Sequence, residues 1–194
     1  MKTLFIILGV LFLLFLGSQI YLYKSSHDIE GYEYVVIKSY ADFEIRKYEA
    51  SLFTSVKLDT DDYKQASSSG FSILGGYIFG KNEQKEQISM TSPVAMTLED
   101  EMTMMFLVPK ALTKDNLPKP ENSAIQFIEM PEKKMAAISF NGWASNEKIE
   151  QYKVALIKLL DENGIKYSNT FLVLGYNPPY EILFRKNEII VELE

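Results

Sequence analysis

An uncharged, strongly apolar segment opens the chain and constrains what its first part can form. Residues 3–23 (TLFIILGVLFLLFLGSQIYLY) contain no acidic or basic side chain. At a rise of about 1.5 Å per residue, a helix of this length matches a bilayer core of about 30 Å. The sequence therefore predicts a single transmembrane helix at residues 3–23.

A cleaved signal peptide is the alternative for this segment, because Met1, Lys2 and the Leu- and Phe-rich run that follows are typical of one. Signal peptidase needs small residues at alternate positions before the cut, but Gly17 and Ser18 are followed by Gln-Ile-Tyr-Leu. We therefore favour an uncleaved anchor over residues 1–23. A polar tether over 24–33 and a folded domain over 34–194 are expected to follow.

The charges that flank the apolar segment predict its orientation. Lys2 lies on one side, whereas acidic residues at 28, 30 and 33 offset Lys24 on the other. Because Lys and Arg favour the cytoplasmic side, we expect the domain on the opposite, non-cytoplasmic face. The sequence contains no N-x-[ST] glycosylation site, so a bacterial periplasm fits better than a secretory lumen.

The composition of the remaining chain excludes several classes of function. Of 20 Lys and Arg residues only Lys2 precedes residue 24, and all 26 Asp and Glu residues follow it, which leaves a net charge of −7. This acidic balance argues against nucleic-acid binding. The absence of cysteine excludes thiolate sites and disulfides, and a single histidine excludes a multi-histidine metal centre.

The folded part shows one order of elements twice. Period-two alternation predicts strands at 43–46 and 52–58, before a helix at 61–77 and strands at 88–98 and 102–108. The second half repeats this order with a strand at 135–140, a helix at 146–163 and strands at 171–176 and 180–193, the last pair turning at residues 186–187. This repeat predicts an α+β fold, in which two helices flank a curved antiparallel sheet or barrel.

Three local features invite a functional interpretation. Residues 75–82 (GGYIFGKN) nearly match a phosphate-binding loop, but they end a helix and Asn82 replaces the hydroxyl, so we interpret them as a helix C-cap. His27 is a residue type that binds haem iron, but it lies in the tether, where we expect it to be solvated. Five methionines between 90 and 105 are typical of adaptable core packing, and a soft wall for a flat apolar ligand is the alternative.

Two stretches resemble the SOUL haem-binding protein family. They are residues 70–82 (GFSILGGYIFGKN) with 88–94 (ISMTSPV), and residues 174–179 (LGYNPP) with 185–189 (RKNEI). The resemblance covers about Tyr34 to Leu193, and it extends to the effector-binding domains of bacterial transcription regulators. It implies a distorted β-barrel of two pseudo-symmetric strand-helix-strand-strand halves. It also implies non-enzymatic binding of haem or a related tetrapyrrole in an apolar cleft beside the first helix.

The positions that match this cleft form the predicted site. The domain has no histidine after residue 27, so only Met or Tyr remains as an iron ligand, and we expect apolar contact to supply the affinity. The cations considered for the carboxylate tails of a ligand are Arg46, Lys81, Arg185 and Lys186. The expected ligand contacts are Phe71, Leu74, Ile78, Met90 and Met96, with Tyr176, Phe184 and Arg185 from the second half.

These observations predict a membrane-anchored protein that binds haem or another porphyrin for buffering or transport. One alternative is a receptor for another hydrophobic small molecule, as in the effector-binding domains. A second is a small-molecule hydrolase that uses Glu99 or Glu181 as a buried acid. A third is a scaffold for partner proteins.

Overall fold

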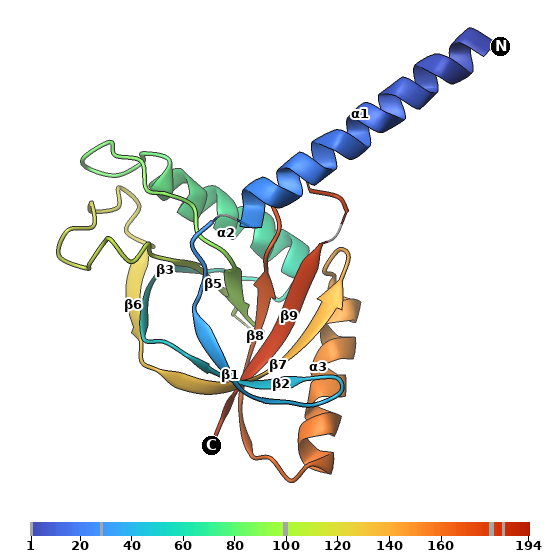
Figure 1. Cartoon of the computed structure of the whole chain (residues 1–194). Helices are drawn as coiled ribbons and strands as arrows, with labels where there is room; N and C mark the ends of the chain where they lie inside the picture. Colours follow the sequence, from blue (N-terminus) through green and yellow to red (C-terminus); the bar gives the residue numbers. More distant parts are fainter. Residues whose placement is uncertain (1, 28, 99–100, 179–180, 184) are drawn as a thin grey trace.

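The computed structural model of the chain describes residues 2–27, 29–98, 101–178, 181–183 and 185–194, with the backbone alone at 22–27 (Figure 1). A long helix leads into a curled sheet that carries two further helices. The elements are α1 (Lys2–His27), β1 (Tyr34–Ser39), β2 (Glu44–Tyr48), β3 (Ser51–Lys57), α2 (Tyr63–Ile78), β4 (Val94–Thr97), β5 (Thr103–Leu107), β6 (Gln126–Met130), β7 (Lys133–Asn141), α3 (Asn146–Glu162), β8 (Tyr167–Gly175) and β9 (Lys186–Leu193).

The sheet contains nine antiparallel strands in the order β1-β2-β7-β9-β8-β4-β5-β3-β6. Apart from the edge strand β1, the first half of the domain supplies β2 to β5 and the second half supplies β6 to β9. Exchanging each strand for its counterpart in the other half gives the same order, read from the opposite end. Each half is strand-strand-helix-strand-strand, so the predicted strand-helix-strand-strand unit lacked one strand. The first strand of each half pairs with a strand of the other half, β2 with β7 and β6 with β3. Because β1 and β6 are edges that do not pair with each other, the predicted barrel is a half-barrel.

The last strand corrects a second prediction. A turn was expected at residues 186–187, but β9 runs without interruption from Lys186, and residues 176–185 connect it to β8. Asn187 pairs through its backbone with Phe140 and Gly175. Its side chain also donates a hydrogen bond to the carbonyl oxygen of Gly142 at 2.7 Å, so it belongs to the sheet.

The N-termini of the two domain helices meet where the halves join. Asp62 caps α2 by accepting a hydrogen bond from the backbone N–H of Gln65, and Ser145 caps α3 in the same way. Asn146, the first residue of α3, accepts a hydrogen bond from the backbone N–H of Tyr63 at 2.8 Å and donates one to Asp62 at 3.0 Å. These bonds fix the two repeats to each other.

The sheet has an apolar core on each face. On one face α2 and α3 pack over Val56, Phe106, Ile189 and their neighbours. On the other face Tyr48, Phe53 and Met105 form a smaller cluster, which Tyr32 covers with its ring centroid 4.6 Å from that of Tyr48. Residues 24–33, the predicted tether, therefore include the last turn of α1 and a segment that packs on the sheet.

The helix α1 is long and apolar enough to cross a bilayer over Lys2–Tyr21, with a mean hydropathy of 2.4. Its described side chains are mostly exposed, as in Leu4, Phe12 and Leu13. Figure 1 shows the helix projecting away from the domain.

Candidate ligand-binding site

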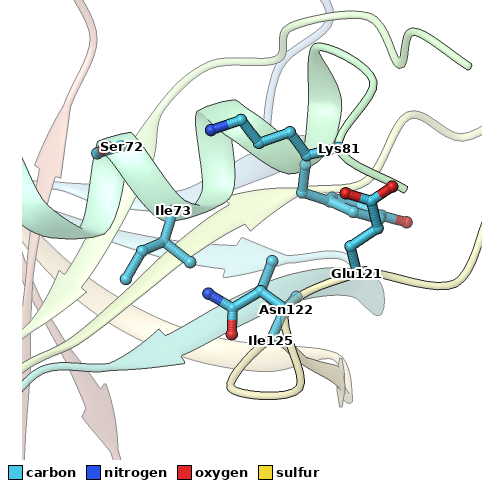
Figure 2. Close-up of a pocket in the computed structure, with 7 residues that line it drawn as sticks. Ser72, Ile73, Lys81, Glu121, Asn122 and Ile125 are labelled. Carbon is cyan, nitrogen blue, oxygen red and sulfur yellow. The ribbon is translucent and has the colours of Figure 1, made fainter. Parts of the chain in front are cut away.

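A pocket of about 310 Å³ lies beside the C-terminal half of α2 (Figure 2). Ile73, Tyr77 and Ile125 form its apolar part, and Ser72, Lys81, Glu121 and Asn122 its polar part. Figure 2 shows Ile73 on the helix facing Asn122 and Ile125 on the loop that joins β5 to β6. The mixture of an apolar wall and a few polar groups is typical of small-molecule sites, and the volume is at the lower end of their usual range.

The end of α2 is held rigidly beside this pocket. Asn82 is fully buried, and its side-chain amide donates hydrogen bonds to the carbonyl oxygens of Tyr77 at 3.0 Å and Glu86 at 2.8 Å. Gly80 has a φ of +105°, and the side chain of Lys81 lies against Gly76, where a Cβ atom would come within 3.1 Å of it. The stretch that resembled a phosphate loop is therefore a helix end, and it directs Lys81 to the pocket.

Tyr77 forms part of the pocket wall, and its hydroxyl group is already engaged in a hydrogen bond within the protein. Its hydroxyl donates to the carbonyl oxygen of Pro118 at 2.7 Å. Burial raises the pKa of Tyr77 to about 12, so the phenol stays protonated at neutral pH. Because the buried hydroxyl is engaged with Pro118, Tyr77 is not positioned to bind iron.

The five residues predicted from the first half are packed into the protein. Leu74, Ile78 and Met96 are buried in the core, and Phe71 and Met90 are half-buried against it. None of the five is among the pocket-lining residues, of which only Ser72, Ile73 and Tyr77 belong to α2. The spacing of Ile73 and Tyr77 by four residues was the sequence signal for the helix side that lines the pocket.

The residues predicted from the second half lie elsewhere. Tyr176 is on the other face of the sheet, and Phe184 lies outside the described residues. Arg185 donates hydrogen bonds to the carbonyl oxygens of Pro178 and Glu181, both at 2.8 Å, and its guanidinium stacks on Trp143 at 3.9 Å from the ring centroid. Burial lowers the pKa of Arg185.

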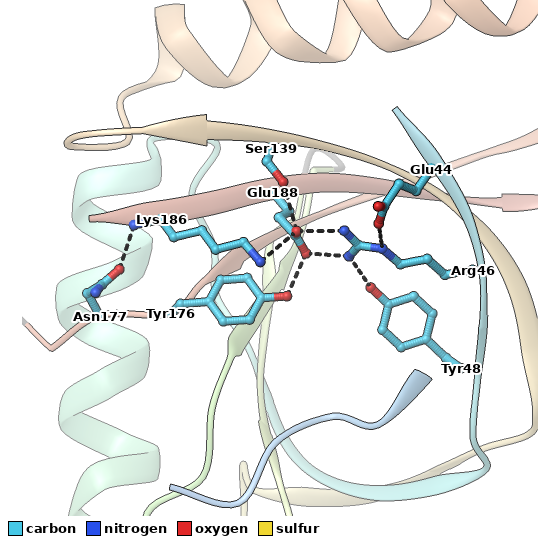
Figure 3. Close-up of polar contacts among 8 residues, drawn as sticks. All are labelled: Glu44, Arg46, Tyr48, Ser139, Tyr176, Asn177, Lys186 and Glu188. Atoms are coloured by element: carbon cyan, nitrogen blue, oxygen red, sulfur yellow. Dashed lines mark hydrogen bonds and ion pairs between the residues drawn. The ribbon is translucent and has the colours of Figure 1, made fainter. Parts of the chain in front are cut away.

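A buried ionic network that was not predicted crosses the other face of the sheet (Figure 3). Arg46 on β2 forms a bidentate pair with Glu188 on β9, with N–O distances of 2.8 and 3.0 Å. Figure 3 shows Glu188 surrounded by donors: Tyr176 at 2.5 Å, Ser139 at 2.9 Å and Lys186 at 3.0 Å also contact its carboxylate. Every charge in this network is satisfied within the chain, which is typical of a structural ion pair.

The pKa values in the network follow from its geometry. Burial alone would raise the pKa of Glu188, but the hydrogen bonds and charge of Arg46, with Lys186 and Tyr176, outweigh it and lower the pKa to about 2. Burial, followed by the negative charge of Glu188, raises the pKa of Tyr176. The carboxylate is therefore ionised and the phenol protonated at neutral pH. Of the four cations considered for ligand carboxylates, Lys81 alone lines the pocket.

Either of two acids was considered for a hydrolase. Glu99 lies outside the described residues, and Glu181 is buried in the connection between β8 and β9. Within the described part of the chain, no three His, Cys, Asp or Glu side chains are grouped so that they could hold a metal ion.

Structural comparison shows the fold alone. The C-terminal domain of EcmrR is 11% identical, with a TM-score of 0.59 over 78% of this chain and 96% of that one. A hydrolase from Listeria innocua is 10% identical, with a TM-score of 0.55 over 81% and 94%.

Sequence comparison goes further and confirms the predicted resemblance. Heme-binding protein 2 of Mus musculus and that of Homo sapiens are each 30% identical over 156 residues, which cover 76% of this chain and 76% of each relative. Heme-binding protein 1 of Xenopus laevis is 26% identical over 76% of this chain and 81% of its own. The family model described as SOUL heme-binding protein matches residues 29–192. Haem is therefore a supported candidate ligand, and the chain belongs to the SOUL heme-binding protein family.

Proposed function

We propose that this chain binds haem or a related tetrapyrrole at the pocket beside α2, by apolar contact and without a histidine ligand. Family membership is the observation that carries the proposal. The matched region begins at residue 29, beyond the only histidine, and the sequence has no cysteine. Histidine and cysteine, two common protein ligands of haem iron, are thus missing from the matched region.

Apolar contact would have to extend beyond the pocket to supply a useful affinity. Micromolar binding corresponds to about 8 kcal/mol. At about 25 cal/mol per Å², this requires about 330 Å² of buried apolar surface, before the entropic cost of association is added. In this proposal one edge of the tetrapyrrole would enter the pocket of about 310 Å³ against Ile73 and Ile125, and the rest of the ring would cover the protein surface around it. Lys81 at the rim would pair with a propionate.

We further propose that α1 anchors the protein in a membrane through residues 3–23. The length and hydropathy of the helix and the exposure of its side chains support this proposal. The domain would then face the non-cytoplasmic side, which is the periplasm in a bacterium, because Lys2 is on the opposite side of the helix. At this position the protein would buffer or transport its ligand next to the bilayer.

The test is a hemin titration of the full-length protein in lipid nanodiscs, with empty nanodiscs as the blank. We expect a saturable shift of the Soret band that Ile73→Glu weakens at least about tenfold, because a buried charge replaces an apolar contact. Val154→Glu on α3 is the matched control, since Val154 is exposed and outside the pocket. His27→Ala should leave the spectrum unchanged.

Two results would contradict the proposal. A shift no larger than that of empty nanodiscs would remove haem as the ligand. Equal weakening by Ile73→Glu and Val154→Glu would place binding away from this pocket.

A further inference from the structure

The connection between β8 and β9 is fastened to α1 by a buried side chain. Gln19, near the end of the apolar part of α1, is only 4% exposed. Its side-chain oxygen accepts hydrogen bonds from the backbone N–H groups of Ile182 at 3.1 Å and Leu183 at 3.5 Å. Figure 1 shows α1 leaving the domain beside this connection.

If α1 is the membrane anchor proposed above, the hydrogen bonds of Gln19 determine how far the β8–β9 connection lies from the bilayer core. The apolar span runs from Lys2 to Tyr21, so Gln19 lies two residues before its end, which is about 3 Å along the helix axis. The interfacial layer on each side of a bilayer core is about 5–8 Å thick. Ile182 and Leu183 are bonded directly to Gln19, and they must therefore lie at or near the boundary between hydrocarbon and headgroups.

The side chains around this contact suit such a boundary. Ile182 is 51% exposed, although it is aliphatic. Trp143 is 56% exposed and stacks on Arg185, which donates a hydrogen bond to the carbonyl oxygen of Glu181 in the same connection. Tryptophan is enriched at membrane interfaces because its ring is apolar and its N–H is polar. An aliphatic side chain is thus exposed on the segment that α1 contacts, and an aromatic side chain is exposed on the loop between β7 and α3, which Arg185 joins to that segment.

We propose that Ile182 and Leu183, together with Trp143, form a membrane-contacting surface that holds the domain against the lipid. The occupant of this surface is the headgroup region of the bilayer that α1 crosses, and the supporting observation is the direct bond between the anchor helix and the connection. The inference rests on the membrane anchoring proposed above, and it adds that the domain lies against the bilayer on this side.

Spin labelling tests the inference directly, because the chain contains no cysteine. Single variants Ile182→Cys, Val154→Cys and Leu13→Cys of the full-length protein are labelled with a nitroxide and reconstituted into phosphatidylcholine vesicles. Collision with oxygen reports lipid contact, and collision with a water-soluble nickel complex reports exposure to water. Val154 is the matched control because it is an aliphatic residue with 53% exposure on α3. Leu13 lies within the apolar span and reports whether α1 is inserted.

We expect the labels at positions 13 and 182 to be protected from the nickel complex and the label at 154 to be accessible to it. Protection at 13 with full accessibility at 182 overturns the membrane-contacting surface and leaves the anchor intact. Accessibility at 13 overturns the anchor and the inference that depends on it. Protection at all three positions overturns the assignment to this surface. In the Ile182→Cys background, Gln19→Leu should restore access to nickel, and unchanged protection contradicts the role of Gln19.

Discussion

The ion pair between Arg46 and Glu188 allows a quantitative prediction about stability. Glu188→Gln preserves the shape of the side chain but removes its charge and replaces one acceptor oxygen with a donor. Arg46 is only 4% exposed, so its guanidinium would remain buried without its main counter-charge. The NH₂ group of the glutamine would also lie next to donors that now contact the carboxylate, including Tyr176 and Lys186, so donor would face donor.

Two lines of reasoning give a similar size for the effect. Breaking a buried ion pair by removing one partner typically costs about 3–5 kcal/mol. Independently, a pKa lowered from 4.5 to about 2 corresponds to about 3 kcal/mol of stability carried by the ionised form of Glu188. We therefore expect Glu188→Gln to lower the free energy of unfolding at pH 7 by about 3 kcal/mol.

The pH dependence has a definite sign. The folded-state pKa of Glu188 is depressed, so its contribution is fully present above the unfolded-state value of 4.5 and is lost as the pH falls toward about 2. Urea unfolding of the full-length protein in detergent, followed by fluorescence of the single tryptophan, should show the wild type losing its advantage over Glu188→Gln in this window.

Glu192→Gln is the matched control on the same strand. Its partner is Lys133 at 2.5 Å, but the Glu192 side chain is 38% exposed, so the loss should be below about 1 kcal/mol. The reasoning is refuted if both variants lose the same stability, or if the difference between Glu188→Gln and the wild type does not change between pH 7 and pH 3.

Two further substitutions test the packing of α2 and its C-terminal end, both by the midpoint of urea unfolding. Gly70→Ala would bring a Cβ atom within 2.8 Å of the sulfur of Met104. This overpacking should lower the free energy of unfolding by about 1–3 kcal/mol, which exceeds the stabilisation expected from the higher helix propensity of alanine. Exposed Ser69→Ala on the same helix should be neutral, and a stabilising Gly70→Ala would contradict the close packing. Asn82→Ala removes three hydrogen bonds at the C-terminal end of α2 and should lower the free energy of unfolding by about 2–3 kcal/mol. Exposed Asn116→Ala is the control, and an equal effect of the two substitutions would show that these hydrogen bonds do not stabilise the helix end.

Local sequence patterns were sufficient for most of the fold. The helices begin at capping residues Asp62 and Ser145, and both caps are visible in the sequence. The strand β6 was missed because its residues (QFIEM) show only a weak alternation, and its place in the sheet depends on β3, more than 70 residues away. The half-barrel likewise depends on whether two edge strands meet, which periodicity does not encode.

The surroundings of the candidate site residues depend on contacts between distant parts of the chain. The predicted contacts Leu74 and Ile78 were taken from positions that match the cleft of the SOUL family, and in this structure both are buried in the core. Arg46 and Glu188 are 142 residues apart, and their pairing requires β2 and β9 to lie on either side of β7. A long-range ion pair of this kind leaves no local signal in one sequence.

The pocket also shows why the repeat alone predicts the site incompletely. Both halves supply a helix that packs on the sheet, so pseudo-symmetry predicts equivalent environments for α2 and α3. The second wall of the pocket, however, comes from residues 108–125, which join one half to the other and so belong to neither copy of the repeat. This linker is tied to the end of α2 by the bond from Tyr77 to Pro118 and by the backbone bond from Glu83 to Lys119 at 3.0 Å. A single connection therefore makes the surface of α2 different from that of α3, and substitutions in the linker should change ligand binding while they leave the pairing of the two halves intact.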